Sequence, residues 1–248
     1  MMLKRILHTS FVLILLLSFG IHLSAQRNTY RKKKIENLDR FEDKFIHFGF
    51  SLGINSADFL LEADVSKNDS LLKVESNPTL GFNLGIVVDL HMGRFFDFRF
   101  IPTLSFCQRN LEYTFRTPGN EKSTFFSKPV ESTYLDFPLN LKLKSLRSGN
   151  FAAYVVGGFM YSYDLTSQEG VKNESFNPDD IIVAVNKNMY SYQVGVGFDF
   201  FLEYFKFSPE FKLSMGLNNN LVQDGTMFAG PLQYLKSRIF LVSFTFEG

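Results

Sequence analysis

The sequence predicts an all-β protein, an eight-stranded antiparallel up-and-down transmembrane β-barrel. From His47 onward, apolar and polar residues alternate with a period of two, the periodicity of a strand with one apolar and one polar face. The alternation recurs in eight stretches, and a tilted strand of about ten residues crosses a bilayer. The connections alternate between long and short, as in a barrel with long outer loops and short periplasmic turns.

The first half of the barrel region supplies four of these strands. Residues 47–55 alternate Phe, Leu and Ile with Gly, Ser and Asn, and residues 80–89 alternate the same apolar types with Gly, Asn and Asp. Residues 96–107 set Phe and Leu against Asp, Arg, Thr and Ser. Residues 135–143 alternate Leu and Phe with Asp, Pro, Asn and Lys. Each stretch therefore predicts a strand with two unlike faces.

The second half supplies the other four strands. Residues 151–165 are the least regular, although Tyr, Gly, Ser and Asp still share a face there. Residues 189–200 alternate Tyr, Val and Phe strictly with Ser, Gln, Gly and Asp. Residues 207–217 and 240–246 repeat the pattern. Long loops are expected near Leu61–Pro78, Thr117–Val130, Thr166–Asn188 and Asn218–Ser237, and short turns near His91–Arg94, Ser145–Asn150 and Leu202–Lys206.

The segment before the strands predicts export from the cytoplasm. Lys4 and Arg5 precede an apolar run, and Ala25 ends the segment, so residues 1–25 are typical of a secretory signal peptide cleaved after Ala25. An uncleaved membrane anchor is the alternative, but the run is shorter than the roughly 20 residues of a spanning helix. Residues 26–44 form a polar periplasmic tail, and residues 45–248 form the barrel domain. The tail carries a basic run that is a candidate partner contact: Arg31, Lys32, Lys33 and Lys34.

Composition excludes several classes of protein. Of the 248 residues, 26 are basic and 25 acidic, so the chain has no broad basic field for nucleic acid. One Cys, Cys107, excludes an internal disulfide, and with only four His we expect no zinc site and no cofactor. The chain has 30 Phe and 10 Tyr, while its mean hydropathy is near zero. The arrangement of these aromatic residues therefore decides between a soluble and a membrane protein.

The apolar faces are predicted to point outward to outer-membrane lipid. A soluble barrel of the lipocalin kind would turn them inward, but eight strands enclose only enough space for a limited set of side chains. The apolar faces carry roughly 40 residues, many of them Phe, which that interior would not hold. The opposite faces are rich in small Gly, Ser and Asn. A closed sheet also pairs every backbone group, as lipid requires.

The inward faces then carry charges of both signs, which we expect to form a salt-bridged plug, because buried charges need partners. They are His47, Asp89, Asp97, Arg99, Arg109, Asp136, Lys142, Asp164, Asp199, Glu210 and Lys212. A catalytic or conducting site is the alternative. After cleavage only His47 and His91 remain as histidines, and neither lies near a serine in a recognisable motif, so no enzyme is expected. Asp179 and Asp180 are read as a solvated acidic loop rather than a cation site.

One strand resembles a known family. Residues 134–142, Tyr-Leu-Asp-Phe-Pro-Leu-Asn-Leu-Lys, resemble the Y-L-E-I-P-L-x-L-K strand of PorT-like outer-membrane barrels of Bacteroidota, with Asp136 where the group often has Glu. Residues 37–55 resemble the start of the PorT family itself, and the resemblance extends over essentially the whole mature chain.

The resemblance implies a role in type IX protein secretion, and in gliding where it occurs. Because eight strands are too narrow for a folded cargo, the expected role is that of an accessory or assembly component. The implied partners are other secretion components, contacted through the basic tail and the long loops. A stand-alone structural or adhesion barrel of the OmpX sort, or less favourably a barrel enzyme, remains as an alternative.

Overall fold

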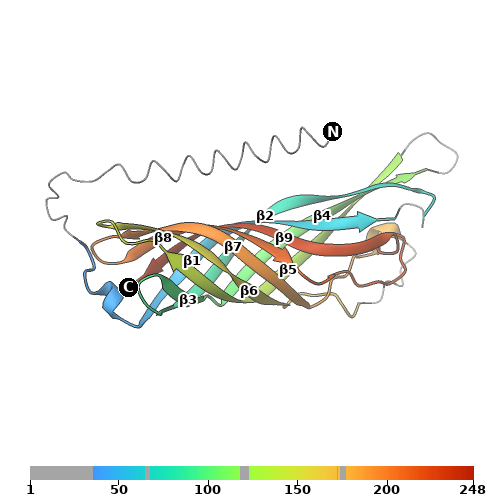
Figure 1. Cartoon of the computed structure of the whole chain (residues 1–248). Coiled ribbons are helices and arrows are strands. Elements are labelled where there is room, and N and C mark those ends of the chain that lie inside the picture. The colour runs from blue at the N-terminus through green and yellow to red at the C-terminus, as the bar shows by residue number, and fades with distance from the viewer. Residues whose placement is uncertain (1–35, 65–67, 118–122, 172, 174–176) are drawn as a thin grey trace, which may run out of the picture. The chain divides into compact units, whose positions relative to one another are not determined.

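The computed structural model describes residues 36–64, 68–117, 123–171, 173 and 177–248 (Figure 1). The predicted signal peptide, its cleavage at Ala25 and the basic run Arg31–Lys34 lie outside these residues. Nine strands are found in the described part of the chain, with short 3-10 helices at Phe41–Asp43 (η2) and Pro178–Asp180 (η4). The strands are β1 Ile46–Ala63, β2 Leu71–His91, β3 Phe96–Phe100, β4 Thr103–Arg116, β5 Ser123–Lys144, β6 Phe151–Asp164, β7 Asn188–Phe201, β8 Lys206–Gly216 and β9 Leu232–Glu247.

The nine strands make an eight-membered ring. Strands β3 and β4 both pair antiparallel with β2 on one side and with β5 on the other, so together they occupy one position. Ile101 and Pro102 separate them, and the Ile86 N–H donates to the Pro102 carbonyl across the break. The remaining strands pair with their neighbours in sequence, and β1 pairs with β9 to close the sheet. The predicted antiparallel up-and-down barrel is confirmed.

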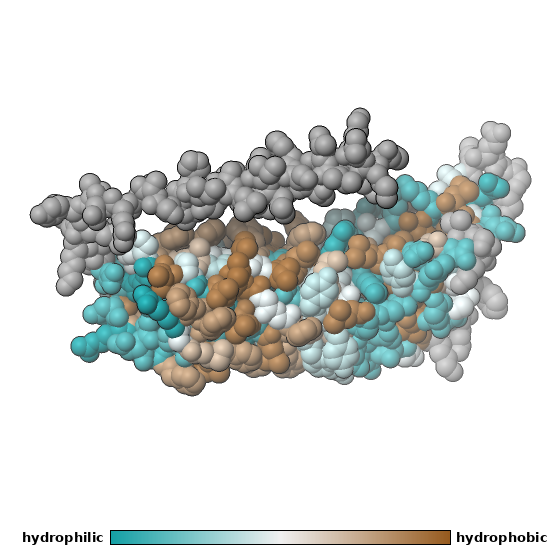
Figure 2. All heavy atoms as spheres, viewed as in Figure 1, coloured by the Kyte–Doolittle hydropathy of each residue, from teal (hydrophilic) through white to brown (hydrophobic). Residues whose placement is uncertain are grey.

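The barrel has a polar inside and an apolar outside. Phe159 on β6 is 68% exposed and Ile86 on β2 is 64% exposed, whereas Arg99 and Glu210 are 0% exposed. On the face seen in Figure 2, apolar side chains form a brown band over one part of the barrel, with hydrophilic residues beyond it. This distribution is the reverse of a soluble barrel and suits a lipid environment. None of the helices in the described residues is long and apolar enough to span a membrane.

At the end of the barrel with the long loops, β2 and β5 reach furthest, with β4 between them (Figure 1). Strand β2 begins at Leu71 and β5 at Ser123, so the long loops predicted near Leu61–Pro78 and Thr117–Val130 are shorter than expected. The predicted extents are wrong because the polarity of the faces inverts along β4. Up to Phe106 the outward residues are apolar, whereas beyond Arg109 the inward residues, such as Tyr113, are the apolar ones.

Candidate functional site

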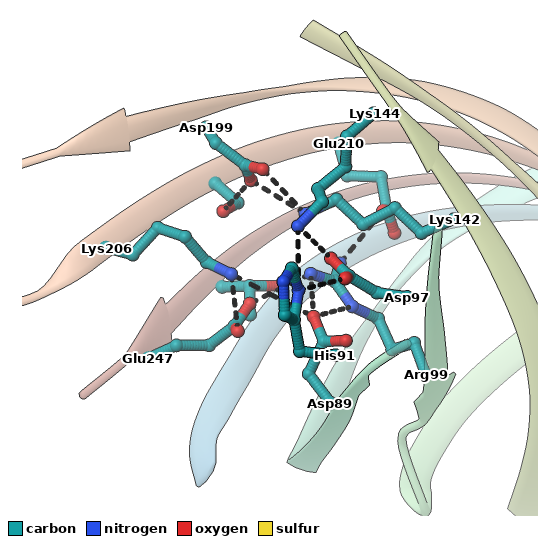
Figure 3. A network of polar contacts seen from close by, with 12 residues as sticks. Asp89, His91, Asp97, Arg99, Lys142, Lys144, Asp199, Lys206, Glu210 and Glu247 are labelled. Carbon is teal, nitrogen blue, oxygen red and sulfur yellow. Dashed lines mark hydrogen bonds and ion pairs between the residues drawn. The ribbon is translucent and has the colours of Figure 1, made fainter. Parts of the chain in front are cut away.

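Buried charges from six strands meet inside the barrel near its short-turn end (Figure 3). Arg99 of β3 is the central cation. Its guanidinium donates to Asp89 of β2 through Nε at 3.1 Å and Nη2 at 2.8 Å. It also donates to Glu247 of β9 at 2.9 Å and to Glu210 of β8 at 3.3 Å. One guanidinium therefore links four strands of the ring, β2, β3, β8 and β9.

Lysines complete this cluster. Lys206 is the first residue of β8. Its Nζ lies 2.7 Å from a Glu247 carboxylate oxygen and 3.9 Å from an Asp89 carboxylate oxygen. Lys212 Nζ lies 2.8 Å from Glu210 on the same strand. Each carboxylate bound by Arg99 therefore has a lysine nearby, and Asp89 has the most distant one.

A second ion pair is packed against the first cluster. Lys142 of β5 donates to both oxygens of Asp199 on β7, at 2.9 and 2.7 Å. The ring of Tyr154 lies between the two clusters, with its centroid 3.8 Å from Lys142 Nζ and 5.6 Å from the Arg99 Cζ. Gly197 makes room for this ring, because a Cβ there would lie 2.3 Å from the Tyr154 Cζ. The tyrosine therefore fills the space between two cations that would otherwise face each other.

The combined network is electrically balanced and closed to water. It contains four basic residues and four acidic ones: Arg99, Lys142, Lys206 and Lys212 with Asp89, Asp199, Glu210 and Glu247. Three of the central side chains, Arg99, Lys142 and Glu210, are 0% exposed. An open pore would leave lumen side chains accessible to water, so the barrel is sealed at this level. Such pairing also offsets the desolvation of buried charge.

The short-turn mouth has its own closure. The Phe41 ring from η2 stacks on His47 with ring centroids 3.8 Å apart, and it meets Phe201 edge-on. Beside it, Asp97 is bound by His91 at 2.8 Å and by Lys144 at 3.0 Å. The segment that precedes β1 is therefore folded into the barrel mouth and packed by aromatic and polar contacts.

The inward charges nearer the long-loop end are held separately. Arg109 donates to Ser237 at 2.8 Å and lies 4.8 Å from the centre of the Phe59 ring. The Ser105 hydroxyl donates to Asp136. Asp164 accepts the backbone N–H of Thr166 at 3.0 Å and that of Thr133 at 3.3 Å. These residues are buried but do not join the central network.

An apolar cluster fills the barrel beyond Arg109. Phe228 and Leu232 are fully buried, and Phe228 packs edge-to-face on Tyr113, Phe115 and Phe126. The residues come from extended strands and from the two loops before β7 and β9: Phe59, Leu71, Leu111, Tyr113, Phe115, Val130, Val183, Val185, Leu221, Phe228, Ala229, Leu232 and Leu235. This outer cluster closes the long-loop end of the barrel.

All eleven charged residues singled out from the sequence lie buried inside the barrel: His47, Asp89, Asp97, Arg99, Arg109, Asp136, Lys142, Asp164, Asp199, Glu210 and Lys212. Six of them form the central network with Lys206 and Glu247, whereas His47 and Asp97 lie at the mouth. The sequence reasoning missed four participants, Lys206, Glu247, His91 and Lys144. Each continues the period-two register of a predicted strand by one more inward position, which is the signal that would have found them.

The charged residues of the central network are bound to one another. No group of three or more His, Cys, Asp or Glu that could hold a metal ion occurs among the residues the structure describes. Asp179 belongs to η4, and its N–H is capped by the Asn177 side chain. Cys107 is buried as a free thiol in the barrel wall. In the described part of the lumen, the carboxylates of the central network are all bound by Arg or Lys.

Comparison with known proteins gives one family and several distant structures. Neisserial surface protein A shares 7% identity over 80% of this chain and 95% of its own, with a TM-score of 0.41. OprG of Pseudomonas aeruginosa shares 12% identity over 82% of this chain and 94% of its own, with a TM-score of 0.38. The N-terminal barrel domain of OprF from the same organism shares 11% identity over 79% of this chain and 96% of its own, with a TM-score of 0.33.

A search of curated proteins finds no match. Residues 24–222 match the family described as "Outer membrane protein beta-barrel domain", which is most of the chain. With its closed antiparallel ring, apolar belt and sealed polar lumen, the chain belongs to this family and is an outer-membrane β-barrel protein.

Proposed function

We propose that this barrel is a non-enzymatic accessory or assembly component of the type IX protein secretion system, acting also in gliding where the host glides. The proposal draws on the resemblance of residues 134–142 and 37–55 to the PorT family. Its structural support is the sealed lumen: Arg99, Lys142 and Glu210 are inaccessible to water inside an eight-membered ring. A barrel that carries no cargo has only its surfaces with which to serve secretion.

Two surfaces suit such a role. One is the outer extension, where β2, β4 and β5 run past the apolar belt with polar residues such as Glu112 facing outward. The other is the periplasmic tail with its basic run Arg31–Lys34. We propose that these surfaces contact other secretion components, with lipid around the belt between them.

A clean deletion in the host tests this proposal, followed by proteomics of the medium, the cell surface and the periplasm. We expect cargo with C-terminal sorting domains to accumulate in the periplasm and to be released again by the intact gene. A second strain replaces Arg31, Lys32, Lys33 and Lys34 by Ser, with the amount of barrel in the outer membrane as the control. Unchanged cargo distribution in the deletion strain would contradict the proposal.

The alternative is a stand-alone structural or adhesion barrel, which the outer extension also favours because it presents ordered strands above the membrane. That function predicts a deletion strain with normal secretion and impaired surface binding. A barrel enzyme is less favoured, because Asp199 is engaged by Lys142 and by the Ser208 hydroxyl at 2.6 Å. If lumen carboxylates were catalytic, replacing Asp136, Asp164 or Asp199 would remove a chemical activity without changing barrel yield.

A further inference from the structure

The barrel wall is incomplete at one place near the outer rim of the apolar belt. Strand β6 ends at Asp164, where it pairs with Tyr134, but β5 continues outward from there to Ser123. Among the described residues, the last backbone link on this side is at Thr133, whose N–H donates to Asp164 and whose carbonyl accepts the Leu165 N–H. Outward of Thr133, β5 keeps its β4 partner while its other edge faces the loop that follows β6.

This edge is not built to receive another strand. Backbone groups of alternate residues point to the same side of a strand, so Pro129 lies on the same edge as Thr133. Proline has no N–H to donate, and proline and charged residues are the usual means by which edge strands avoid pairing. Glu131 is the charged residue on the same edge. The edge is therefore suited to face a loop and a ligand rather than a further β-strand.

A cavity of about 560 Å³ lies at this edge, a volume typical of small-molecule sites. Its lining includes outward residues, Phe82 and Phe106, and inward ones, Cys107 and Val130. The loop after β6 contributes polar Gln168 and, further on, apolar residues 182, 183 and 185. Residues from both faces of β4 and β5 can line one cavity where the wall is interrupted, so the cavity extends from the lipid side toward the outer cluster.

The chemistry of the lining is amphipathic. Phe82, Phe106 and Val130 give apolar walls, and Leu80, which also lines the cavity, is 74% exposed. The polar part of the lining carries uncharged hydroxyl and amide groups from Gln108, Thr133, Thr166, Ser167 and Gln168, and among the described lining residues Glu131 is the one acidic residue. An apolar chain with a neutral or zwitterionic head matches this mixed lining, whereas an anionic head would meet the carboxylate of Glu131.

We propose that this lateral cavity binds the acyl chain of an uncharged or zwitterionic amphiphile, which enters sideways from the membrane between β5 and the loop that follows β6. The chain lies between Phe106 and Val130, and the head contacts the hydroxyl and amide groups of the lining. The inference is independent of the proposed role in secretion, since it depends only on the wall and the cavity.

Photo-crosslinking of the protein purified from outer membranes tests the site. In one arm the probe is a monoacylglycerol with a diazirine in its chain, added to detergent-solubilised protein. In the other it is a phosphatidylethanolamine with the diazirine in one chain, built into nanodiscs. We expect adducts concentrated in residues 129–133 and 166–168, and competed away by excess unlabelled probe. Labelling in the first arm assigns a free amphiphile, and labelling in the second assigns a membrane lipid.

Cavity-filling variants make the test specific. Gln108→Trp on β4 and Gln168→Trp on the loop place a large ring in the cavity, and each should lower the crosslinking yield at least fivefold. Leu104→Trp is the matched control, since it lies on the same face of β4 outside the cavity and should stay within twofold of wild type. The exposed position of residue 168 makes its variant informative even if Gln108→Trp fails to fold.

Three results would overturn the proposal. The first is adducts spread evenly over lipid-facing positions such as Leu139 and Phe159 in both arms. The second is a yield that neither filling variant changes. The third is the absence of labelling at the cavity in both arms.

Discussion

Arg99→Met is expected to destabilise the folded barrel by about 3–5 kcal/mol, the usual cost of removing one partner of a buried ion pair. The three carboxylates around Arg99 would differ in the cationic partners that they keep. Glu247 would keep Lys206 at 2.7 Å, and Glu210 would keep Lys212 at 2.8 Å. Asp89 would keep only Lys206, at 3.9 Å, although it is 1% exposed. Most of the cost therefore comes from Asp89.

Urea unfolding of the protein in lipid vesicles measures this cost, with the heat-sensitive gel migration of folded barrels as the readout. For a urea slope of about 2 kcal/mol/M, the unfolding midpoint should fall by about 2 M. Asp89→Asn in the Arg99→Met background should recover at least about 2 kcal/mol of unfolding free energy, because it removes the buried negative charge that has lost Arg99. Arg94→Met in the exposed turn after β2 is the control and should stay within about 0.5 kcal/mol of wild type.

The reasoning is refuted if Arg99→Met unfolds at the wild-type midpoint. It is also refuted if the added Asp89→Asn change lowers stability further, because the loss of stability would then not come from the Asp89 carboxylate.

Three further predictions follow from packing. Phe159→Arg, in the middle of the apolar belt, should cost about 2–4 kcal/mol in the same urea assay, whereas Tyr163→Arg near the outer end of the same face should cost at most about 1 kcal/mol; equal costs would contradict the placement of the belt. Gly197→Leu should displace Tyr154 and cost about 1–3 kcal/mol by overpacking, and a wild-type midpoint would argue against that contact. Phe228→Ala should cost about 3–5 kcal/mol and expose the long-loop end to protease, so unchanged cleavage would contradict the outer cluster.

The lumen charges could be predicted from the sequence because a strand alternates its faces strictly. Asp97 and Arg99, for example, fall on the inward side once Phe96, Phe98 and Phe100 are assigned to lipid. The same register reaches Lys206 and Glu247, but the predicted strands stopped one residue short at each of these ends. The pattern gives the face of a residue, whereas its ion-pair partners depend on the closure of the ring.

The outer cluster could not be predicted in this way. Its members Val183, Leu221 and Phe228 lie in the loops before β7 and β9, where no period exists to assign a face. Its strand members, such as Tyr113, point inward although they are apolar, which reverses the rule that holds inside the membrane. Only the folded chain shows that loops and extended strands bury one another above the belt.

Planar-bilayer recording of the purified protein tests most directly whether the ion-paired network seals the lumen. With Arg99, Lys142 and Glu210 inaccessible to water, the protein inserted into the bilayer should give no channel steps above the baseline at either sign of voltage. Insertion is verified on the same preparation by the heat-sensitive gel migration. Stable, reproducible steps from the wild-type protein would contradict a sealed lumen and would return transport through the barrel to consideration.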